Sequence, residues 1–201
     1  MIPTIDYYLA PQSPWAYLGH QRFAAIAREA GARVNVLPVD FGGKVFPVSG
    51  GLPLAQRAPQ RQAYRLLELK RFSDHLGMPL NLHPKYFPVN GDDASRLIIA
   101  VDLHEGSDMA MVLAGAVLRA VWAEERDIAD AGELTAMLGS CGLPASRLGD
   151  SHSAAVQQRY EANAQRAVET GVFGAPSFVI DGQLFWGQDR LDFVQRRLAQ
   201  G

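Results

Sequence analysis

The sequence predicts an α/β protein in which an all-helical segment is inserted between a β-α-β half and a β-β-α half. Runs of β-branched and aromatic residues typical of strands lie only near the two ends of the chain. From about residue 56 to residue 155, apolar residues recur at helical spacing, with no strand pattern of comparable quality. The chain has 201 residues, 48% of them hydrophobic, which is enough for one sizeable core with such an insertion.

The N-terminal half begins with a predicted strand over residues 3–9. After a short breaker segment, Ser13 and Pro14 predict the start of a helix. Ser can accept a hydrogen bond from a free N–H group there, and Pro at the first helical position loses none. Apolar residues at helical spacing continue this helix as far as Gly31. The run over 34–39 predicts a second strand and completes a β-α-β unit with a right-handed crossover.

The middle of the chain begins with a segment rich in Gly and Pro, residues 41–55, which we expect to be a long loop. Apolar spacing then predicts a series of helices, the first of them ended by Gly77. These helices are centred on residues 64–72, 97–101, 111–122 and 134–138.

The last quarter of the chain returns to strands. Asp181-Gly182 is the strongest two-residue hairpin signal in the sequence and predicts two antiparallel strands. The elements expected here are a helix over 156–170, a strand over 174–180 that is entered through a proline, a strand over 183–186 and a final helix over 191–198.

Composition excludes several classes of partner. A net charge of −2 and a pI near 6.2 argue against nucleic acid or an anionic membrane. The most apolar stretch, 109–122, contains Arg119 and is shorter than the roughly 20 residues that cross a bilayer. The N-terminus lacks the pattern of a secretory signal, and a single cysteine, Cys141, fits a reducing compartment. We therefore expect a cytoplasmic protein.

One dense basic cluster lies at the start of the predicted insertion. It contains Arg57, Arg61, Arg65, Lys70 and Arg71, together with Glu68. Charged residues on a predicted helix usually form its solvated face, and we interpret the cluster in this way. Contact with an anionic substrate is the alternative.

Three segments carry a resemblance to a known family. They are DYYLAPQSPWAYL at 6–18, VFGAP at 172–176 and WGQDRL at 186–191. The element order, with a proline directly before the third strand, resembles the thioredoxin arrangement. The helical insertion resembles that of the disulfide-oxidoreductase A (DsbA-like) subgroup and the kappa-class glutathione transferases. In order and spacing, the three segments most resemble the 2-hydroxychromene-2-carboxylate isomerase family.

The resemblance implies a division of the chain. A thioredoxin-like domain built from 1–55 and 156–201 would hold glutathione, and a helical insertion domain, 56–155, would form a wall of the substrate pocket. The resemblance also implies a homodimer.

Ser13 is the implied catalytic residue. Redox-active members of the fold carry a Cys-Pro-x-Cys segment, but residues 13–16 are Ser-Pro-Trp-Ala, so thiol–disulfide exchange is excluded at this site. From local sequence alone, Ser13 would simply cap its helix. The resemblance implies that bound glutathione supplies the sulfur, and that the Ser13 hydroxyl and the helix dipole stabilise its thiolate.

The resemblance also implies a set of glutathione contacts. These residues are Ala175, Pro176, Trp186, Gly187, Gln188 and Asp189. A cis peptide before Pro176 would let the cysteinyl backbone pair with Ala175, although proline also begins many edge strands. Asp189 would accept the γ-glutamyl ammonium while Gln188 and backbone N–H groups hold the carboxylate; helix capping is the alternative role for Asp189. Trp186 could equally be an ordinary rim aromatic.

For the electrophilic substrate, Lys44 is the candidate to bind a carboxylate. Arg61, Tyr64, Tyr86 and Asn90 are the other candidates to line the pocket. The family frequently has an Asn before the first helix of the insertion, where this chain has Leu54-Ala55-Gln56. The five histidines show no zinc-ligand spacing and no Gly-rich phosphate loop occurs, so we expect neither a metal nor a nucleotide.

These implications together point to a glutathione-dependent cis–trans isomerase of 2-hydroxychromene-2-carboxylate or a related aromatic-degradation intermediate, acting by transient thiolate addition. A kappa-like transferase that releases a stable conjugate is one alternative. A non-catalytic glutathione- or peptide-binding module is the other.

Overall fold

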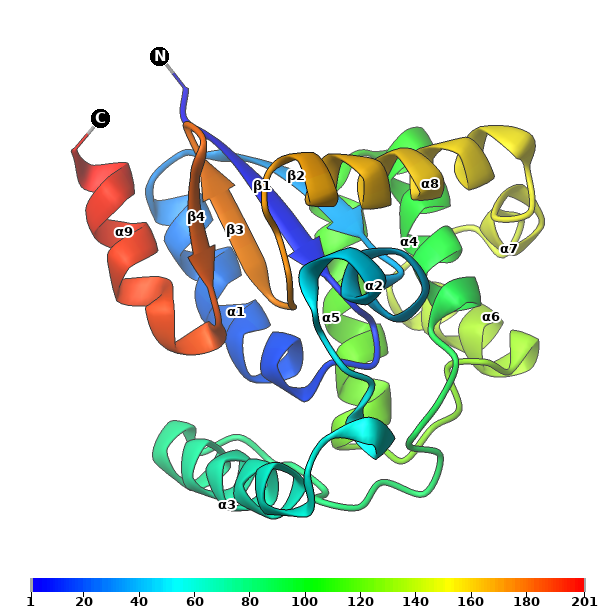
Figure 1. Cartoon of the computed structure of the whole chain (residues 1–201). Coiled ribbons are helices and arrows are strands. Elements are labelled where there is room, and N and C mark those ends of the chain that lie inside the picture. The colour runs from blue at the N-terminus through cyan, green and yellow to red at the C-terminus, as the bar shows by residue number, and fades with distance from the viewer. Residues whose placement is uncertain (1, 201) are drawn as a thin grey trace.

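The computed structural model describes residues 2–200. Its centre is a four-stranded sheet in the order β2-β1-β3-β4 (Figure 1). β1 (Thr4–Leu9) runs parallel to β2 (Arg33–Pro38) and antiparallel to β3 (Ser177–Ile180), which pairs antiparallel with β4 (Gln183–Trp186). The two halves of the sheet therefore come from opposite ends of the chain, as predicted.

Helices surround this sheet and fill the segment between its halves. In chain order they are α1 (Pro14–Glu29), α2 (Phe46–Ser49), α3 (Pro59–Leu76), α4 (Asp92–Glu105), α5 (Ser107–Trp122), α6 (Ala131–Ser140), α7 (Arg147–Asp150), α8 (Ala154–Glu169) and α9 (Leu191–Ala199). This order confirms the predicted fold class. No helix within residues 2–200 is both long enough and apolar enough to cross a membrane.

The central strand β1 buries both of its faces. Successive side chains of a strand point to opposite sides. Ile5 and Tyr7 accordingly lie in the core that contains Phe23 of α1 and Leu191 of α9. Tyr8 lies in a second core with residues of α8. The sheet is thus covered on both faces, by α1 and α9 on one side and α8 on the other (Figure 1).

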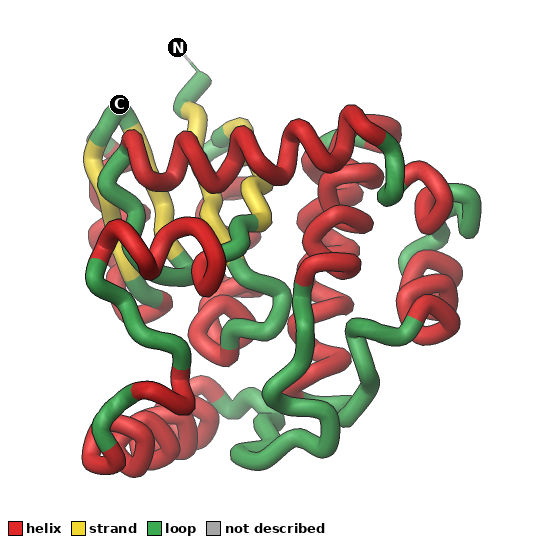
Figure 2. Tube along the Cα trace, turned by 45° about the vertical axis from the view of Figure 1, so that its right-hand side comes forward, coloured by secondary structure: helices red, strands yellow, loops and turns green. Residues whose placement is uncertain are grey.

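The helical segment shares its core with the sheet domain. Leu97 of α4 and Leu113 of α5 are completely buried in the same cluster as Ile5 and Phe23. α3 stands further out, below the rest of the molecule in both views (Figures 1 and 2), and contacts the core through the buried Leu69. The boundaries at 55/56 and 155/156 remain a prediction.

The prediction of one long loop over 41–55 is wrong in part. A π-helical turn spans Phe41–Val45, α2 follows directly, and a 3₁₀ turn spans Leu54–Gln56. The Asp40 side chain accepts a hydrogen bond from the Gly43 N–H at 2.8 Å, and Phe41 and Val45 are buried. The Asp40 cap and the burial of Phe41 and Val45 therefore stabilise a helical turn despite the two glycines in it.

Element boundaries also differ by a few residues. α8 begins at Ala154 rather than 156, because Ser153 caps it and accepts a hydrogen bond from Val156 N–H. The short helix α7 was not predicted. Gly31 and Gly77, which were expected to end helices, and Gly171, which follows α8, all have positive φ, which suits that position.

Candidate active site

Ser13 lies between β1 and α1, directly before the first residue of α1. Its backbone is extended, and its hydroxyl oxygen accepts a hydrogen bond from Ala16 N–H at 3.2 Å. Pro14 occupies the first helical position, so the local sequence explains the helix start. The capping role that local sequence predicts for Ser13 is therefore confirmed.

The Ser13 hydroxyl also faces the segment before β3. It donates to the carbonyl oxygen of Ala175 at 3.5 Å, and Ser13 is only 9% exposed. The Ala175–Pro176 peptide is cis, as the resemblance implied. Among residues 2–200 the Ala175 N–H has no hydrogen-bond partner, and so remains free to donate.

The 173–187 region is held together by its own contacts. The Ser177 hydroxyl donates to the Gly174 carbonyl at 2.7 Å, and Gly187 N–H donates to the Pro176 carbonyl at 2.9 Å. Trp186 is half exposed and packs against Phe173, with ring centroids 4.7 Å apart. A Cβ on Gly174 would collide with the Trp186 indole. Trp186 and Phe173 thus form an aromatic wall beside Ala175.

Gln188 is buried and supports the loop that follows β4. Arg22 of α1 donates through Nη2 to the Gln188 side-chain oxygen and to its main-chain carbonyl, the latter at 3.0 Å. Burial lowers the pKa of Arg22, and the nearby Asp189 carboxylate partly offsets this effect. Gly19 lies under Gln188, with no room for a Cβ. Arg22 therefore occupies the side-chain oxygen of Gln188, whereas the Gln188 amide nitrogen has no such contact within the described residues.

Asp189 presents its carboxylate at the surface. The side chain is 44% exposed, and its Oδ2 lies 3.3 Å from Nη1 of Arg190. It follows Gly187, whose φ of +106° favours glycine. The structure therefore places a solvent-accessible carboxylate in the turn directly after Trp186.

Sequence reasoning missed Arg22, Phe173 and Gln12. The side-chain oxygen of Gln12 is buried without a hydrogen-bond partner, against Gly91. One signal could have found Arg22: Gly19 and Arg22 are three residues apart, which places them on one face of α1. Phe173 and Gln12 have no such signal, since both lie in irregular segments.

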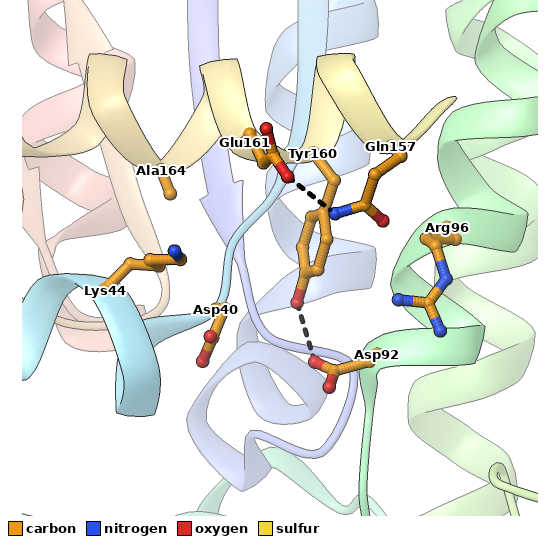
Figure 3. A pocket seen from close by; sticks show the side chains of 8 residues that line it. All are labelled: Asp40, Lys44, Asp92, Arg96, Gln157, Tyr160, Glu161 and Ala164. Atoms are coloured by element: carbon orange, nitrogen blue, oxygen red, sulfur yellow. Dashed lines mark hydrogen bonds between the residues drawn. The ribbon is translucent and has the colours of Figure 1, made fainter. Parts of the chain in front are cut away.

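Lys44 lines a polar cleft of about 170 Å³ between the 41–45 turn, α4 and α8 (Figure 3). The cleft residues are Asp40, Lys44, Asp92, Arg96, Gln157, Tyr160, Glu161 and Ala164. The Tyr160 hydroxyl donates to Asp92 at 2.9 Å, and burial raises the pKa of Tyr160. Three carboxylates thus surround the two cations of this cleft.

The other substrate candidates do not meet Lys44 in that cleft. Arg61 and Tyr64 are exposed on α3. Tyr86 is 36% exposed, with Lys85 over its ring. Asn90 accepts a hydrogen bond from Asp92 N–H at 2.7 Å, beside the start of α4. Within residues 2–200 no group of three or more His, Cys, Asp or Glu side chains could hold a metal ion.

The chain matches one known protein family over nearly its whole length. Residues 4–199 match the DSBA-like thioredoxin domain. The chain belongs to the DSBA-like thioredoxin domain family. The chain itself has no cysteine pair, since its only cysteine, Cys141, lies at the end of α6.

Two related proteins align with almost the full length of the chain. A 2-hydroxychromene-2-carboxylate isomerase of Sphingobium xenophagum is 29% identical, over 98% of this chain and 99% of its own. One of Pseudomonas putida is 26% identical, over 98% of this chain and 94% of its own. A solved 2-hydroxychromene-2-carboxylate isomerase superposes with a TM-score of 0.80 at 24% identity, over 98% of this chain and 95% of that one. The resemblance inferred from sequence is confirmed, and these relatives support an isomerase.

Proposed function

We propose that the chain is a glutathione-dependent cis–trans isomerase of 2-hydroxychromene-2-carboxylate or a closely related conjugated intermediate. The observation that carries the proposal is the position of the Ser13 hydroxyl, at the buried N-terminus of the 16-residue helix α1 and 3.5 Å from the Ala175 carbonyl. The names of the full-length relatives support the reaction and substrate class.

The residues around Ser13 suit a thiol-bearing peptide. The free N–H of Ala175 can donate to a peptide carbonyl, as an added strand would require. The exposed Asp189 carboxylate can accept from an ammonium group, and the Trp186–Phe173 wall can cover the peptide from one side. In this proposal Gln188 acts through its N–H groups, because Arg22 already donates to both of its oxygens.

Glutathione would supply the sulfur nucleophile that this segment lacks, and its reversible addition to a conjugated carbon would allow rotation about the former double bond. The protein's part is electrostatic. A helix N-terminus stabilises a nearby anion by up to about 2 kcal/mol, and each unit of pKa depression corresponds to about 1.4 kcal/mol. Together with a hydrogen bond from Ser13, α1 can therefore lower a thiol pKa by roughly one to two units.

Isothermal titration with glutathione tests the cofactor. We expect saturable binding to the wild-type protein and weaker binding to Asp189→Ala. The absence of saturation up to millimolar glutathione would refute the proposal.

Product analysis separates the two possible enzymes. With 2-hydroxychromene-2-carboxylate as substrate, an isomerase regenerates glutathione, whereas a transferase consumes one equivalent per turnover. We expect the glutathione concentration to stay constant while the substrate isomerises.

A further inference from the structure

Arg65 on α3 occupies an unusual environment. Its guanidinium carbon lies 5.4 Å from the ring centroid of Phe87 and 5.6 Å from that of Trp122, and these two rings pack against each other at 4.8 Å. Burial lowers the pKa of Arg65 to about 10, so the side chain still carries its charge at neutral pH. The prediction of a solvated helix face is therefore wrong for this residue, because the apolar segment around Phe87 covers it.

No carboxylate compensates this charge. Within residues 2–200 Arg65 forms no ion pair and no side-chain hydrogen bond, and the charge that most affects it is a second cation, Arg57. By contrast, Lys70 and Arg71 on the same helix are exposed and are paired with Asp74 and Glu68. Arg57 and Arg61 also lack an ion pair in the described part of the chain, but Arg61 is exposed to solvent, whereas Arg65 is partly buried against two aromatic rings. Buried charges are normally paired, so this site lacks an anionic partner.

The guanidinium of Arg65 is open to a ligand. Its nitrogen atoms have no hydrogen-bond partner in the described part of the chain, and they keep some access to solvent. The aromatic faces hold the guanidinium plane by cation–π contact and leave its N–H groups free to donate. A planar fork of this kind matches a carboxylate.

Arg65 lies on the side of α3 that faces the start of α1. Arg65, Leu69 and Phe72 are spaced i, i+4 and i+7, which places them on one helix face. Leu69 is fully buried, and Phe72 contacts Trp15, two residues after Ser13, with ring centroids 6.0 Å apart. Figure 1 shows α3 beneath the N-terminal end of α1.

The segment that carries Phe87 also leads to the Ser13 loop. Phe87 precedes Gly91 by four residues, which span at most about 14 Å. Gly91 packs against the side chain of Gln12, the neighbour of Ser13, with no room for a Cβ between them. The segment 87–91 thus connects the ring beside Arg65 to the loop that carries Ser13.

We propose that Arg65 is an anion-binding, specificity-determining residue, and that it takes the carboxylate of a conjugated aromatic substrate whose apolar part lies near Phe87 and Trp122. Lys44 is less suited to this task, because its cleft already contains the carboxylates of Asp40, Asp92 and Glu161. The identity of the substrate rests on the proposed function. The binding of an aromatic carboxylate by Arg65 does not depend on it.

The test compares an aromatic carboxylate with its uncharged isostere. trans-Cinnamate and cinnamamide are titrated separately into the wild-type protein, Arg65→Met, Arg65→Lys and, as a matched control on α3, Arg71→Met. We expect the wild type and Arg71→Met to bind cinnamate at least tenfold more tightly than cinnamamide. Arg65→Met should lose this preference, and Arg65→Lys should recover part of it. A preference that survives in Arg65→Met overturns the inference.

Two further measurements keep the inference separate from protein folding and from the proposed function. In the wild type, cinnamate affinity should fall with rising salt while cinnamamide affinity stays constant, and equal salt dependence would contradict an ionic contact without any variant. Arg65→Met should raise KM for 2-hydroxychromene-2-carboxylate at least tenfold with unchanged glutathione affinity. If the wild type binds no glutathione but keeps its preference for cinnamate, the proposed function fails and the anion site stands.

Discussion

The Tyr7 hydroxyl lies 3.2 Å from Nδ1 of His20, in the core between β1 and α1. The other ring nitrogen, Nε2, lies 2.9 Å from the carbonyl oxygen of Met111 on α5. A carbonyl can only accept, so Nε2 carries the proton and Nδ1 accepts from Tyr7. His20 is therefore a neutral link between the helix that bears Ser13 and the inserted helices.

Acid should destabilise the protein through His20. Burial lowers the pKa of His20 to about 4, below its unfolded value of about 6.5. Between these values the unfolded state binds more protons, so the free energy of unfolding falls as pH decreases, by up to about 3 kcal/mol from this group. Urea unfolding between pH 7.5 and 4.5 measures the loss. His20→Gln should show a shallower pH dependence, and an unchanged slope would contradict this origin.

The two roles of Ser13 can be separated by substitution. Ser13→Ala should lower the free energy of unfolding by about 1 kcal/mol through loss of the cap, whereas Ser13→Asn should keep the cap and most of the stability. Both variants should lose at least tenfold in isomerase turnover, because neither offers a hydroxyl to a thiolate. Thermal unfolding and turnover, measured on the same preparations, check this. Full activity in Ser13→Asn would mean that Ser13 only caps α1.

The carboxylate of Asp189 should matter for glutathione, whereas its neighbour should not. Asp189→Asn removes a charged acceptor, and we expect the glutathione Kd to rise about tenfold, in line with hydrogen bonds to charged groups of about 1.5–3 kcal/mol. Arg190→Gln frees Asp189 from its 3.3 Å ion pair and should leave Kd equal or lower. Calorimetry measures the glutathione Kd of both variants. Equally weak binding by both would mean that the substitutions act by disturbing the 187–190 turn rather than by removing a carboxylate.

Two glycine-to-alanine changes should have opposite effects. Gly139 in α6 has no atom within 4 Å of an added Cβ, so Gly139→Ala should stabilise the fold by about 0.5–1 kcal/mol through helix propensity. At Gly19 the added Cβ would lie 2.8 Å from Cβ of Gln188. Gly19→Ala should therefore displace the 187–189 turn, lower the melting temperature and weaken glutathione binding. Stabilisation by both changes would show that α1 can move away from the turn.

Sequence reasoning succeeded where local chemistry decides the structure. Ser13 and Pro14 specify a helix start, and Asp181-Gly182 specifies a hairpin, whatever surrounds them. The cis Ala175–Pro176 peptide came only from family resemblance, since nothing local distinguishes it from an ordinary strand entry.

Other features could not be predicted because they depend on tertiary contacts. Arg65 belongs to a polar helix face by its sequence neighbours, and only the approach of Phe87 and Trp122 buries it. The contact of Arg22 with both oxygens of Gln188 likewise has no signal in the sequence around Gln188. In both cases the partner comes from a distant part of the chain, and residue type and spacing carry no record of it.

The split sheet has a consequence for synthesis of the protein. β1 pairs with β3 through residue pairs such as Asp6 and Val179, so one edge of β1 has no partner until the last strands have left the ribosome. At about 5–20 residues per second, that delay is roughly 10–30 seconds. During this time a nascent chain presents an apolar strand with unpaired backbone groups, which is a template for aggregation. The sheet therefore cannot be completed before almost the whole chain has been synthesised.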